Sequence, residues 1–283
     1  MYAKGDKICR YLHTRTIMKH EKVGPFIDQL QSRGKYSLSI QEVLNKTKQP
    51  PRTVRRALER LQQKGRISLV TRGFYAIVPL EYKESRVLPV EWFIHQLMDY
   101  LGLTYYVGLL SAAALHGAAH QRPQEFQVFI RKQLRPVRVD GLRIRFLVKK
   151  NLDLSSGIVQ IKTETGYILV SSPELTSIDL LEYSNSVGGL NNIATVIAEL
   201  GERINVDALL KVARKEKSLV FVQRLGYLLD HLGFEAKTDG LLRWLSGQKT
   251  HPVLLDPAQK KGKSLLNKKW KLFENQKIEP ELL

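Results

Sequence analysis

Residues 51–65 read PRTVRRALERLQQKG, and this stretch decides how the first part of the chain folds. Val54, Leu58 and Leu61 recur at the spacing of one helical face, so they form a stripe that can be buried. The arginines of the stretch lie outside that stripe. The pattern therefore predicts a helix with an apolar side packed against the protein and a basic side facing outward.

The residues on either side predict the motif to which this helix belongs. Upstream, a short strand-like run ends at Ser39, and Glu42 follows three positions later, which is the capping-box spacing that begins a helix. Downstream, residues 67–70 and 74–78 are typical of two strands joined by a tight turn. Helix, turn, basic helix and two-stranded wing is the order of a winged helix-turn-helix, which we assign to residues 23–80.

The basic helix predicts an interaction with double-stranded DNA, because a helix fits the major groove and arginine can bond both guanine and phosphate. The predicted DNA-binding residues are Lys46, Lys48, Arg52, Thr53, Arg55, Arg56, Arg60, Arg66 and Arg72. Residues 52–56 are expected to meet base edges and the remaining cations to contact phosphates. Two other interpretations stay open: a solvated charged face, or a winged helix that binds only protein.

Charge is distributed unevenly along the 283 residues, whose formal net charge is +18. The first 80 residues hold 17 Lys or Arg against 5 Asp or Glu, a net +12, so the remainder carries only +6. This asymmetry is typical of a nucleic-acid-binding end joined to a nearly neutral remainder. Residues 1–22 form a basic leader, either an arm that follows DNA phosphates or a disordered segment. Because Met18 could also be the first residue, the sequence leaves open whether residues 1–17 belong to the protein.

Cysteine content and hydropathy bear on where the protein resides. Its single cysteine, Cys9, excludes an intramolecular disulfide framework and any zinc cluster built from cysteines, which favours a reducing compartment. No apolar run approaches the length of a membrane span, and the first residues lack the apolar core of a secretory signal. We expect a cytoplasmic protein without membrane contact.

The remaining residues, 84–283, predict a larger mixed α/β domain with a helical C-terminal part, so the fold class is α/β in the α+β sense. Strand-like runs occupy residues 126–130, 137–139, 144–148, 159–163 and 167–170. Helical patterns occupy residues 90–101, 111–117, 173–181, 192–200, 206–213, 219–232 and 241–245. Two edge segments follow at residues 252–257 and 270–273.

Several separated segments resemble the AbiEi-type antitoxins, transcriptional regulators of type IV toxin–antitoxin and abortive-infection systems in bacteria. The similar segments follow the winged domain in order: residues 105–117 (YYVGLLSAAALHG), 123–128, 172–181 (SPELTSIDLL), 188–190 and 255–257 before Trp270. The resemblance implies an autorepressor that binds inverted repeats in its own promoter, as a dimer if the operator is palindromic. It also implies that residues 84–283 counteract a nucleotidyltransferase-fold toxin, with direct contact between the two proteins left open.

An enzymatic alternative is a metal-dependent nuclease, or another enzyme acting on nucleic acid, targeted by the winged helix. Such a nuclease needs carboxylates on adjacent strands to hold a divalent cation. Glu125, Asp140 and Glu164 are the available acids, but they fall at strand edges or turns without motif spacing. We therefore expect no catalytic residues and no enzymatic activity.

Three further features have ordinary structural explanations. His116 and His120 lie four residues apart but lack a third ligand at zincin spacing, so a hydrogen-bonded helix-end histidine is expected. The sequence around Gly188 and Gly189 lacks the lysine of a phosphate-binding loop. The two glycines are instead expected to cap a helix. Cys9 has no partner cysteine and is expected to be an inert thiol. We therefore predict neither a metal site nor a cofactor.

Overall fold

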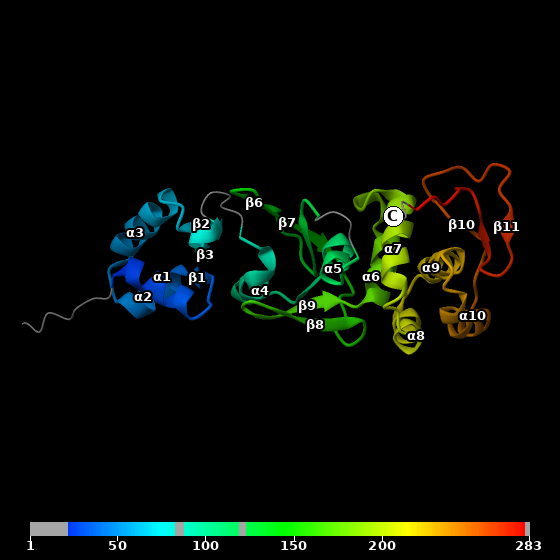
Figure 1. The fold of residues 1–283 in the computed structure, drawn as a ribbon, viewed down its shortest axis with the longest axis horizontal. Coiled ribbons are helices and arrows are strands. Elements are labelled where there is room, and N and C mark those ends of the chain that lie inside the picture. The colour runs from blue at the N-terminus through cyan, green and yellow to red at the C-terminus, as the bar shows by residue number, and fades with distance from the viewer. Residues whose placement is uncertain (1–21, 83–87, 119–122, 281–283) are drawn as a thin grey trace, which may run out of the picture.

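The computed structural model describes residues 22–82, 88–118 and 123–280, and these form an elongated body. Figure 1 shows the N-terminal helices at one end, a large sheet in the middle, and further helices with a small sheet at the other end. Among the described residues, no helix is both long and apolar enough to span a lipid bilayer.

The N-terminal part follows the order of elements expected from the sequence. These elements are α1 (Val23–Ser32), β1 (Ser37–Ser39), α2 (Ile40–Thr47), α3 (Pro51–Gln63), β2 (Ile67–Thr71) and β3 (Phe74–Ile77). The strands pair antiparallel in the order β1-β3-β2. The helices cover one face of this sheet, where Val54 and Leu58 of α3 are fully buried in a cluster with Leu38 and Ile67.

Local capping explains where α2 and α3 begin and end. The Ser39 hydroxyl accepts a hydrogen bond from the Glu42 amide at 3.1 Å, as the spacing predicted. The Glu42 carboxylate binds Lys35 Nζ at 2.7 Å, so the capping box is not closed reciprocally. Lys48 ends α2 in the left-handed conformation, and Pro51 occupies the first turn of α3, where its missing amide hydrogen costs nothing.

A six-stranded mixed sheet forms the middle of the molecule. It comprises β4 (Tyr105–Val107), β5 (Phe126–Ile130), β6 (Val137–Val139), β7 (Leu142–Val148), β8 (Ile158–Thr163) and β9 (Gly166–Ser171). The spatial order is β6-β7-β5-β4-β9-β8, so β6 and β8 are the two edges. The central strand β4 was not predicted, because its three residues are too few to show the alternation of a strand.

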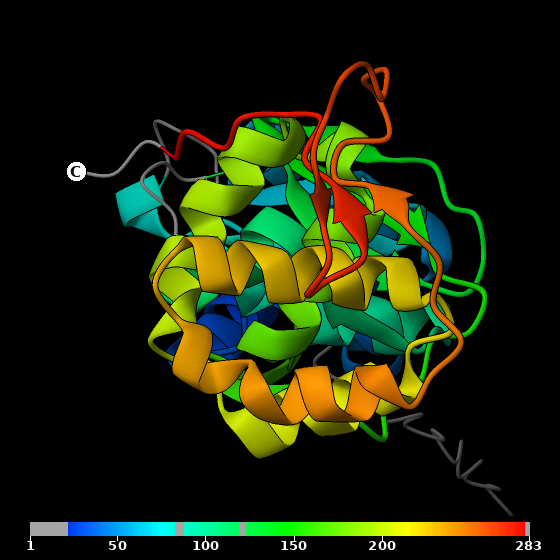
Figure 2. The same cartoon turned by 90° about the vertical axis from the view of Figure 1, so that its right-hand side faces the viewer.

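Helices and a second small sheet complete the fold. They are α4 (Ile94–Leu101), α5 (Leu109–Leu115), α6 (Pro173–Glu182), α7 (Gly189–Gly201), α8 (Val206–Lys215), α9 (Leu219–His231), α10 (Asp239–Ser246), β10 (Val253–Leu254), β11 (Leu266–Asn267) and β12 (Leu272–Phe273). Short 3-10 helices are η1 (Leu80–Tyr82), η2 (Val90–Trp92), η3 (Ser184–Ser186) and η4 (Glu235–Lys237). Figure 2 looks at the end formed by α9, α10 and the small sheet, from which the loop between β10 and β11 projects.

Several predicted helices differ in their bounds from those in the structure, and for two of them the structure shows what the altered segment does instead. The helix expected over residues 90–101 is broken at Phe93, which is fully buried and has a non-helical φ of −138°. The helix expected from Ser111 begins earlier, at Leu109. The Ser111 hydroxyl is not a cap; it accepts a hydrogen bond from the Gln127 amide at 2.9 Å and so ties α5 to β5.

The N-terminal sheet shares a hydrophobic core with the residues that follow it. Its second face presents Val70, Phe74 and Ala76, which belong to one buried cluster with Leu97 and Met98 of α4. The rings of Tyr36 and Trp92 also pack with centroids 4.8 Å apart. The N-terminal sheet is therefore covered on both faces, by its own helices and by the central part of the molecule.

Candidate functional site

Helix α3 presents the arginines that the sequence singled out. Because Val54 and Leu58 are buried against the N-terminal core, the side chains of Arg52, Arg55 and Arg56 are exposed. Within the described part of the chain, none of these three arginines has an ion-pair partner. Their positive charges are therefore not neutralised by ion pairs with other described residues.

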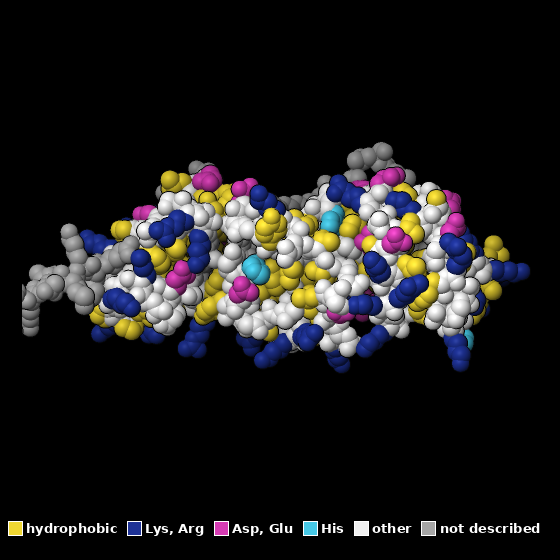
Figure 3. Space-filling model, turned by 90° about the horizontal axis from the view of Figure 1, so that it is seen from below, with side chains coloured by type: hydrophobic (Ala, Val, Ile, Leu, Met, Phe, Trp, Pro, Cys, Tyr) yellow, Lys and Arg dark blue, Asp and Glu magenta, His cyan; other side chains and the backbone are white. Residues whose placement is uncertain are grey.

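The end of α2 extends this surface. Lys46 and Lys48 are exposed just before α3, and Arg60 is exposed one turn further along it, with its Nε donating to the Arg56 carbonyl at 3.3 Å. We call the following set the basic face: Lys46, Lys48, Arg52, Thr53, Arg55, Arg56 and Arg60. Figure 3 shows Lys and Arg side chains projecting at both ends of the molecule, one of which carries this face.

Arg66 and Arg72, the other predicted DNA contacts, have different surroundings. Arg66 is half-buried and forms an ion pair with Asp28 of α1, which fixes the start of β2 to the first helix. Arg72 has an exposed side chain in the β2–β3 turn, and its carbonyl accepts a hydrogen bond from Tyr100 Oη at 3.0 Å. The structure thus gives Arg66 an internal partner and leaves the Arg72 side chain at the surface.

The β2–β3 turn is held from outside the N-terminal part. Gly73 has φ +80°, and a Cβ there would lie 2.7 Å from Tyr100 Oη, so glycine is required by both conformation and space. The rings of Phe74 and Tyr100 pack with centroids 5.3 Å apart. Nearby, the Ser68 hydroxyl donates to Asp140 in the β6–β7 turn at 2.8 Å. Tyr100 and Asp140 therefore fix the orientation of β2 and β3.

The acids considered for a nuclease do not come together. Asp140 follows β6 and Glu164 follows β8, which are opposite edges of the six-stranded sheet. Glu125 pairs with Arg138 at 3.6 Å. In residues 22–82, 88–118 and 123–280, no three His, Cys, Asp or Glu side chains are grouped closely enough to hold a metal ion.

The other residues weighed from the sequence have structural surroundings where they are described. His116 is buried, and its Nε2 lies 2.7 Å from the Ser171 carbonyl oxygen, which accepts its hydrogen. Gly188 adopts the left-handed conformation at the start of α7, consistent with a capping role. His120 and Cys9 lie outside the described residues.

A buried polar cluster in the central part was not predicted. Asp179 of α6 is fully buried, and its carboxylate binds Lys149 Nζ at 2.5 Å and accepts a hydrogen bond from Tyr106 Oη at 3.0 Å. Lys149 also pairs with Glu182 at 3.2 Å. The cluster links β4, the end of β7 and α6. Its sequence signal was the acid Asp179 between Ile178 and the pair Leu180 and Leu181, since a buried carboxylate requires a partner.

Burial controls the ionisation of this cluster. Desolvation raises the pKa of Asp179 from 3.8 to about 6, although Lys149 acts in the opposite direction. Burial also raises the pKa of Tyr106 well above its ordinary value, so the phenol stays neutral and donates to Asp179. Lys149 remains charged because the attraction of Asp179 and Glu182 outweighs its own desolvation and raises its pKa.

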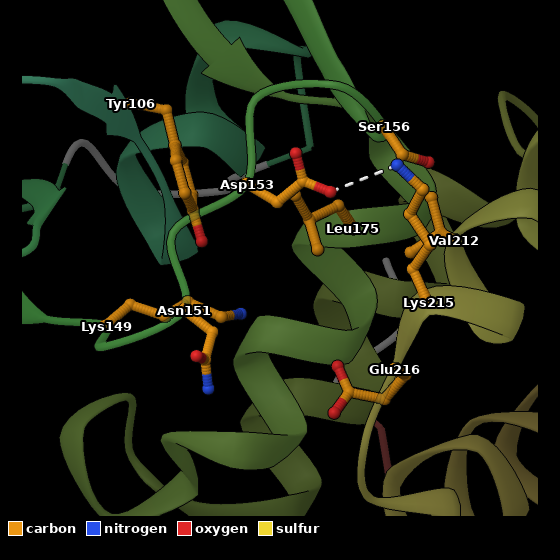
Figure 4. Close-up of a pocket in the computed structure, with 9 residues that line it drawn as sticks. All are labelled: Tyr106, Lys149, Asn151, Asp153, Ser156, Leu175, Val212, Lys215 and Glu216. Atoms are coloured by element: carbon orange, nitrogen blue, oxygen red, sulfur yellow. Dashed lines mark hydrogen bonds and ion pairs between the residues drawn. The ribbon is translucent and has the colours of Figure 1, made fainter.

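A small pocket of about 80 Å³ opens beside the cluster (Figure 4). Tyr106 comes from β4, Asn151 and Asp153 from the loop after β7, and Lys215 from the end of α8. Asp153 and Lys215 form an ion pair across it at 3.0 Å. Hydrogen bonds from Ser155, together with Lys215, lower the pKa of Asp153 to about 2. Asp153 and Lys215 thus neutralise each other at the side of the pocket.

The architecture and the basic face define a mixed α/β protein with an exposed cationic helix at one end. Residues 106–231 match the family model of the AbiEi antitoxin C-terminal domain, so this part of the chain is similar to that domain. The match confirms the resemblance drawn from the sequence motifs and supports an antitoxin role in a toxin–antitoxin system. It extends from β4 to the end of α9 and includes the buried cluster.

A solved structure shares the fold over most of the chain. The crystal structure of the Rv2827c protein from Mycobacterium tuberculosis superimposes with a TM-score of 0.64 at 15% sequence identity. The similarity covers 88% of this chain and 90% of that one. None of the curated proteins with which the sequence was compared is similar to it.

Proposed function

We propose that the protein is an antitoxin that also represses its own operon by binding DNA, with residues 23–80 acting as a winged helix-turn-helix. The observation that carries the proposal is the exposure of Arg52, Arg55 and Arg56 on α3 without ion-pair partners among the described residues. The order α1, β1, α2, α3, β2, β3 and the antiparallel β1-β3-β2 sheet agree with that motif. In this proposal α3 enters the major groove.

The roles of the basic residues follow from their positions. Arg52, Thr53, Arg55 and Arg56 lie in the first half of α3, the part of a recognition helix that meets base edges. Lys46, Lys48, Arg60 and Arg72 lie around it and are assigned to phosphates. Arg66 is assigned a supporting role, since its pairing with Asp28 orients β2.

Antitoxin activity is assigned to residues 84–283, which contain the part similar to the AbiEi antitoxin domain. The toxin proposed as the functional partner is a nucleotidyltransferase-fold protein encoded beside this gene, and the proposed site of action is the cytoplasm. Co-expression of the full chain with that toxin should restore growth. Failure of rescue with the full chain would contradict this part of the proposal.

DNA binding is tested with the full-length protein and a labelled fragment of the region upstream of its gene. Replacing Arg55 and Arg56 by alanine should cost roughly 1–3 kcal/mol for each arginine that contacts a base, and it should reduce discrimination against scrambled DNA. Arg214→Ala with Arg243→Ala, which removes two exposed arginines from α8 and α10, is the matched control. Equal affinities for both double variants would contradict the DNA-binding proposal.

A further inference from the structure

The net charge outside the first 80 residues is concentrated at one place. Residues 81–248 hold 20 Lys or Arg against 18 Asp or Glu, whereas residues 249–271 hold seven lysines against a single Asp256. We call those seven the C-terminal lysine cluster: Lys249, Lys260, Lys261, Lys263, Lys268, Lys269 and Lys271. All seven are exposed. The protein thus has a second strongly basic end.

This cluster lies on the small sheet and the loop that projects from it. β10, β11 and β12 form the end of the molecule opposite α3 (Figures 1 and 2). In the described residues, Lys269 is the member that forms an ion pair, with Asp230 at 2.5 Å. Lys261 lies over the Phe273 ring at 3.6 Å, and Lys271 binds the Thr250 hydroxyl at 3.0 Å. The cluster keeps most of its charge available to an external anion.

Two exposed leucines lie among these lysines. Leu265 is 76% exposed and Leu266 is 43% exposed, between Lys263 and Lys268 in the sequence. Exposed apolar side chains at this position do not contribute to the core of the chain. Lysines around exposed apolar side chains fit a surface that is anionic outside and apolar just beneath, which is the boundary of an anionic lipid bilayer.

The side chains of the cluster fit an anionic lipid bilayer better than they fit nucleic acid. It contains no arginine to bond phosphates bidentately, and its aromatic rings are not presented for base stacking, since Trp270 is buried and Phe273 lies under Lys261. Asn267 is engaged with the Glu274 carboxylate at 3.0 Å. A nucleic-acid surface also offers no apolar layer for Leu265.

We propose that the C-terminal lysine cluster, with Leu265 and Leu266, is a peripheral binding site for anionic lipid membranes. The lysines are attracted to the headgroups, and Leu265 enters the boundary between headgroups and acyl chains. The site lies outside residues 106–231, the part that matches the antitoxin family, and at the opposite end from the basic face. The sequence-based expectation of no membrane contact rested on the lack of a spanning segment, which a surface contact does not need.

The test places a nitrobenzoxadiazole label at the proposed contact in the full-length chain. Cys9→Ser removes the only native cysteine, and Leu265→Cys then carries the label. Leu80→Cys is the matched control, because Leu80 is 74% exposed but lies in a different region, at the start of η1. Vesicles of phosphatidylcholine with phosphatidylglycerol should shift the emission of the label at 265 to the blue, and vesicles of phosphatidylcholine alone should not. The label at 80 should respond to neither.

Charge variants test the same site without a label. Lys260→Gln, Lys263→Gln and Lys268→Gln together should reduce co-sedimentation with the anionic vesicles by more than tenfold, since each lysine near an anionic surface contributes roughly fivefold. Arg55→Ala with Arg56→Ala should change it far less. An unshifted label at 265 would overturn the proposal, as would a triple variant that still binds vesicles fully. Loss of duplex RNA or DNA binding in the triple variant, with vesicle binding unchanged, would identify a nucleic-acid surface instead.

Discussion

Lys149 is the residue whose removal should have the largest electrostatic effect on folding. It is the cation that compensates Asp179, which is fully buried, and Glu182. Lys149→Met should therefore lower the free energy of unfolding by about 3–5 kcal/mol at pH 8, because it leaves the buried Asp179 carboxylate without its cation. Lys150→Met is the control; it removes the neighbouring exposed lysine and should change stability by less than about 0.5 kcal/mol.

The stability loss in Lys149→Met should depend on pH. The folded-state pKa of Asp179 is about 6, above its ordinary value of 3.8, so its ionisation costs stability as pH rises through that window. Below about pH 6 the Asp179 carboxyl of the folded protein is mostly protonated, and the missing cation matters less. Urea unfolding at pH 5 and pH 8 should give a smaller difference from wild type at pH 5. A difference that grows on acidification would contradict the buried charge pair.

Gly226 in α9 is a second position where a single substitution should lower stability, because there is no room for a Cβ atom. A Cβ there would lie 2.2 Å from the Trp270 ring, which is buried and donates from Nε1 to Asp230 at 2.6 Å. Gly226→Ala should destabilise the protein by about 1–3 kcal/mol through overpacking. Gly240→Ala in α10, where the nearest atom would be 3.7 Å away, should be neutral or stabilising by up to about 1 kcal/mol. Thermal unfolding of both variants is the measurement, and equal midpoints for the two would contradict the prediction.

At the scale of elements, the β2–β3 turn depends on α4. Tyr100 donates to the Arg72 carbonyl, so we predict that Tyr100→Phe loosens the turn and weakens the proposed DNA binding through Arg72. The hydrogen bond is worth about 0.5–1.5 kcal/mol at most. Arg72→Ala should weaken binding by itself, and the two changes together should be less than additive.

The control for this cycle is Tyr167→Phe, which alters an exposed tyrosine on β9. It should leave DNA affinity unchanged. Fluorescence anisotropy of the four-variant cycle at two salt concentrations is the measurement. Full additivity of Tyr100→Phe and Arg72→Ala would show that the turn does not transmit the effect of Tyr100.

At the scale of the whole molecule, the shared cluster predicts cooperative unfolding. Leu97 is fully buried between α4 and the N-terminal sheet, and Leu97→Ala should cost about 2–5 kcal/mol. Because Val70 and Phe74 belong to the same cluster, the amides of β2 and β3 should lose protection from hydrogen exchange together with those of α4. Unchanged protection of β2 and β3 in this variant would mean that the parts unfold separately.

The shared cluster also bears on dividing the chain. Residues 84–283 expressed alone would lose Val70, Phe74 and Ala76 from the buried cluster that they share with Leu97 and Met98. Antitoxin activity is therefore better located with point variants of the full chain than with fragments. The proposed boundary near residue 80 separates the two proposed roles, while the apolar packing continues across it.

Features set by near neighbours could be predicted from the sequence. The buried stripe of α3, the Ser39 cap and the strands flanking residues 71–73 depend on periodicity and on contacts three or four residues apart. The exposure of Arg52, Arg55 and Arg56 follows from that same stripe. Several motifs in order, among them residues 105–117 and 172–181, indicated the antitoxin family that residues 106–231 match.

Long-range packing decided the rest. The pairing of Lys149 with Asp179 joins residues 30 positions apart, and that of Tyr106 with Asp179 spans 73 positions. The anchoring of Arg72 by Tyr100 and the placement of β4 within the sheet likewise require the folded chain. Local patterns carry no information on which apolar surfaces meet. Only the tertiary structure therefore decided that the N-terminal sheet is covered on both faces and that the lysines of residues 249–271 gather at the opposite end from α3.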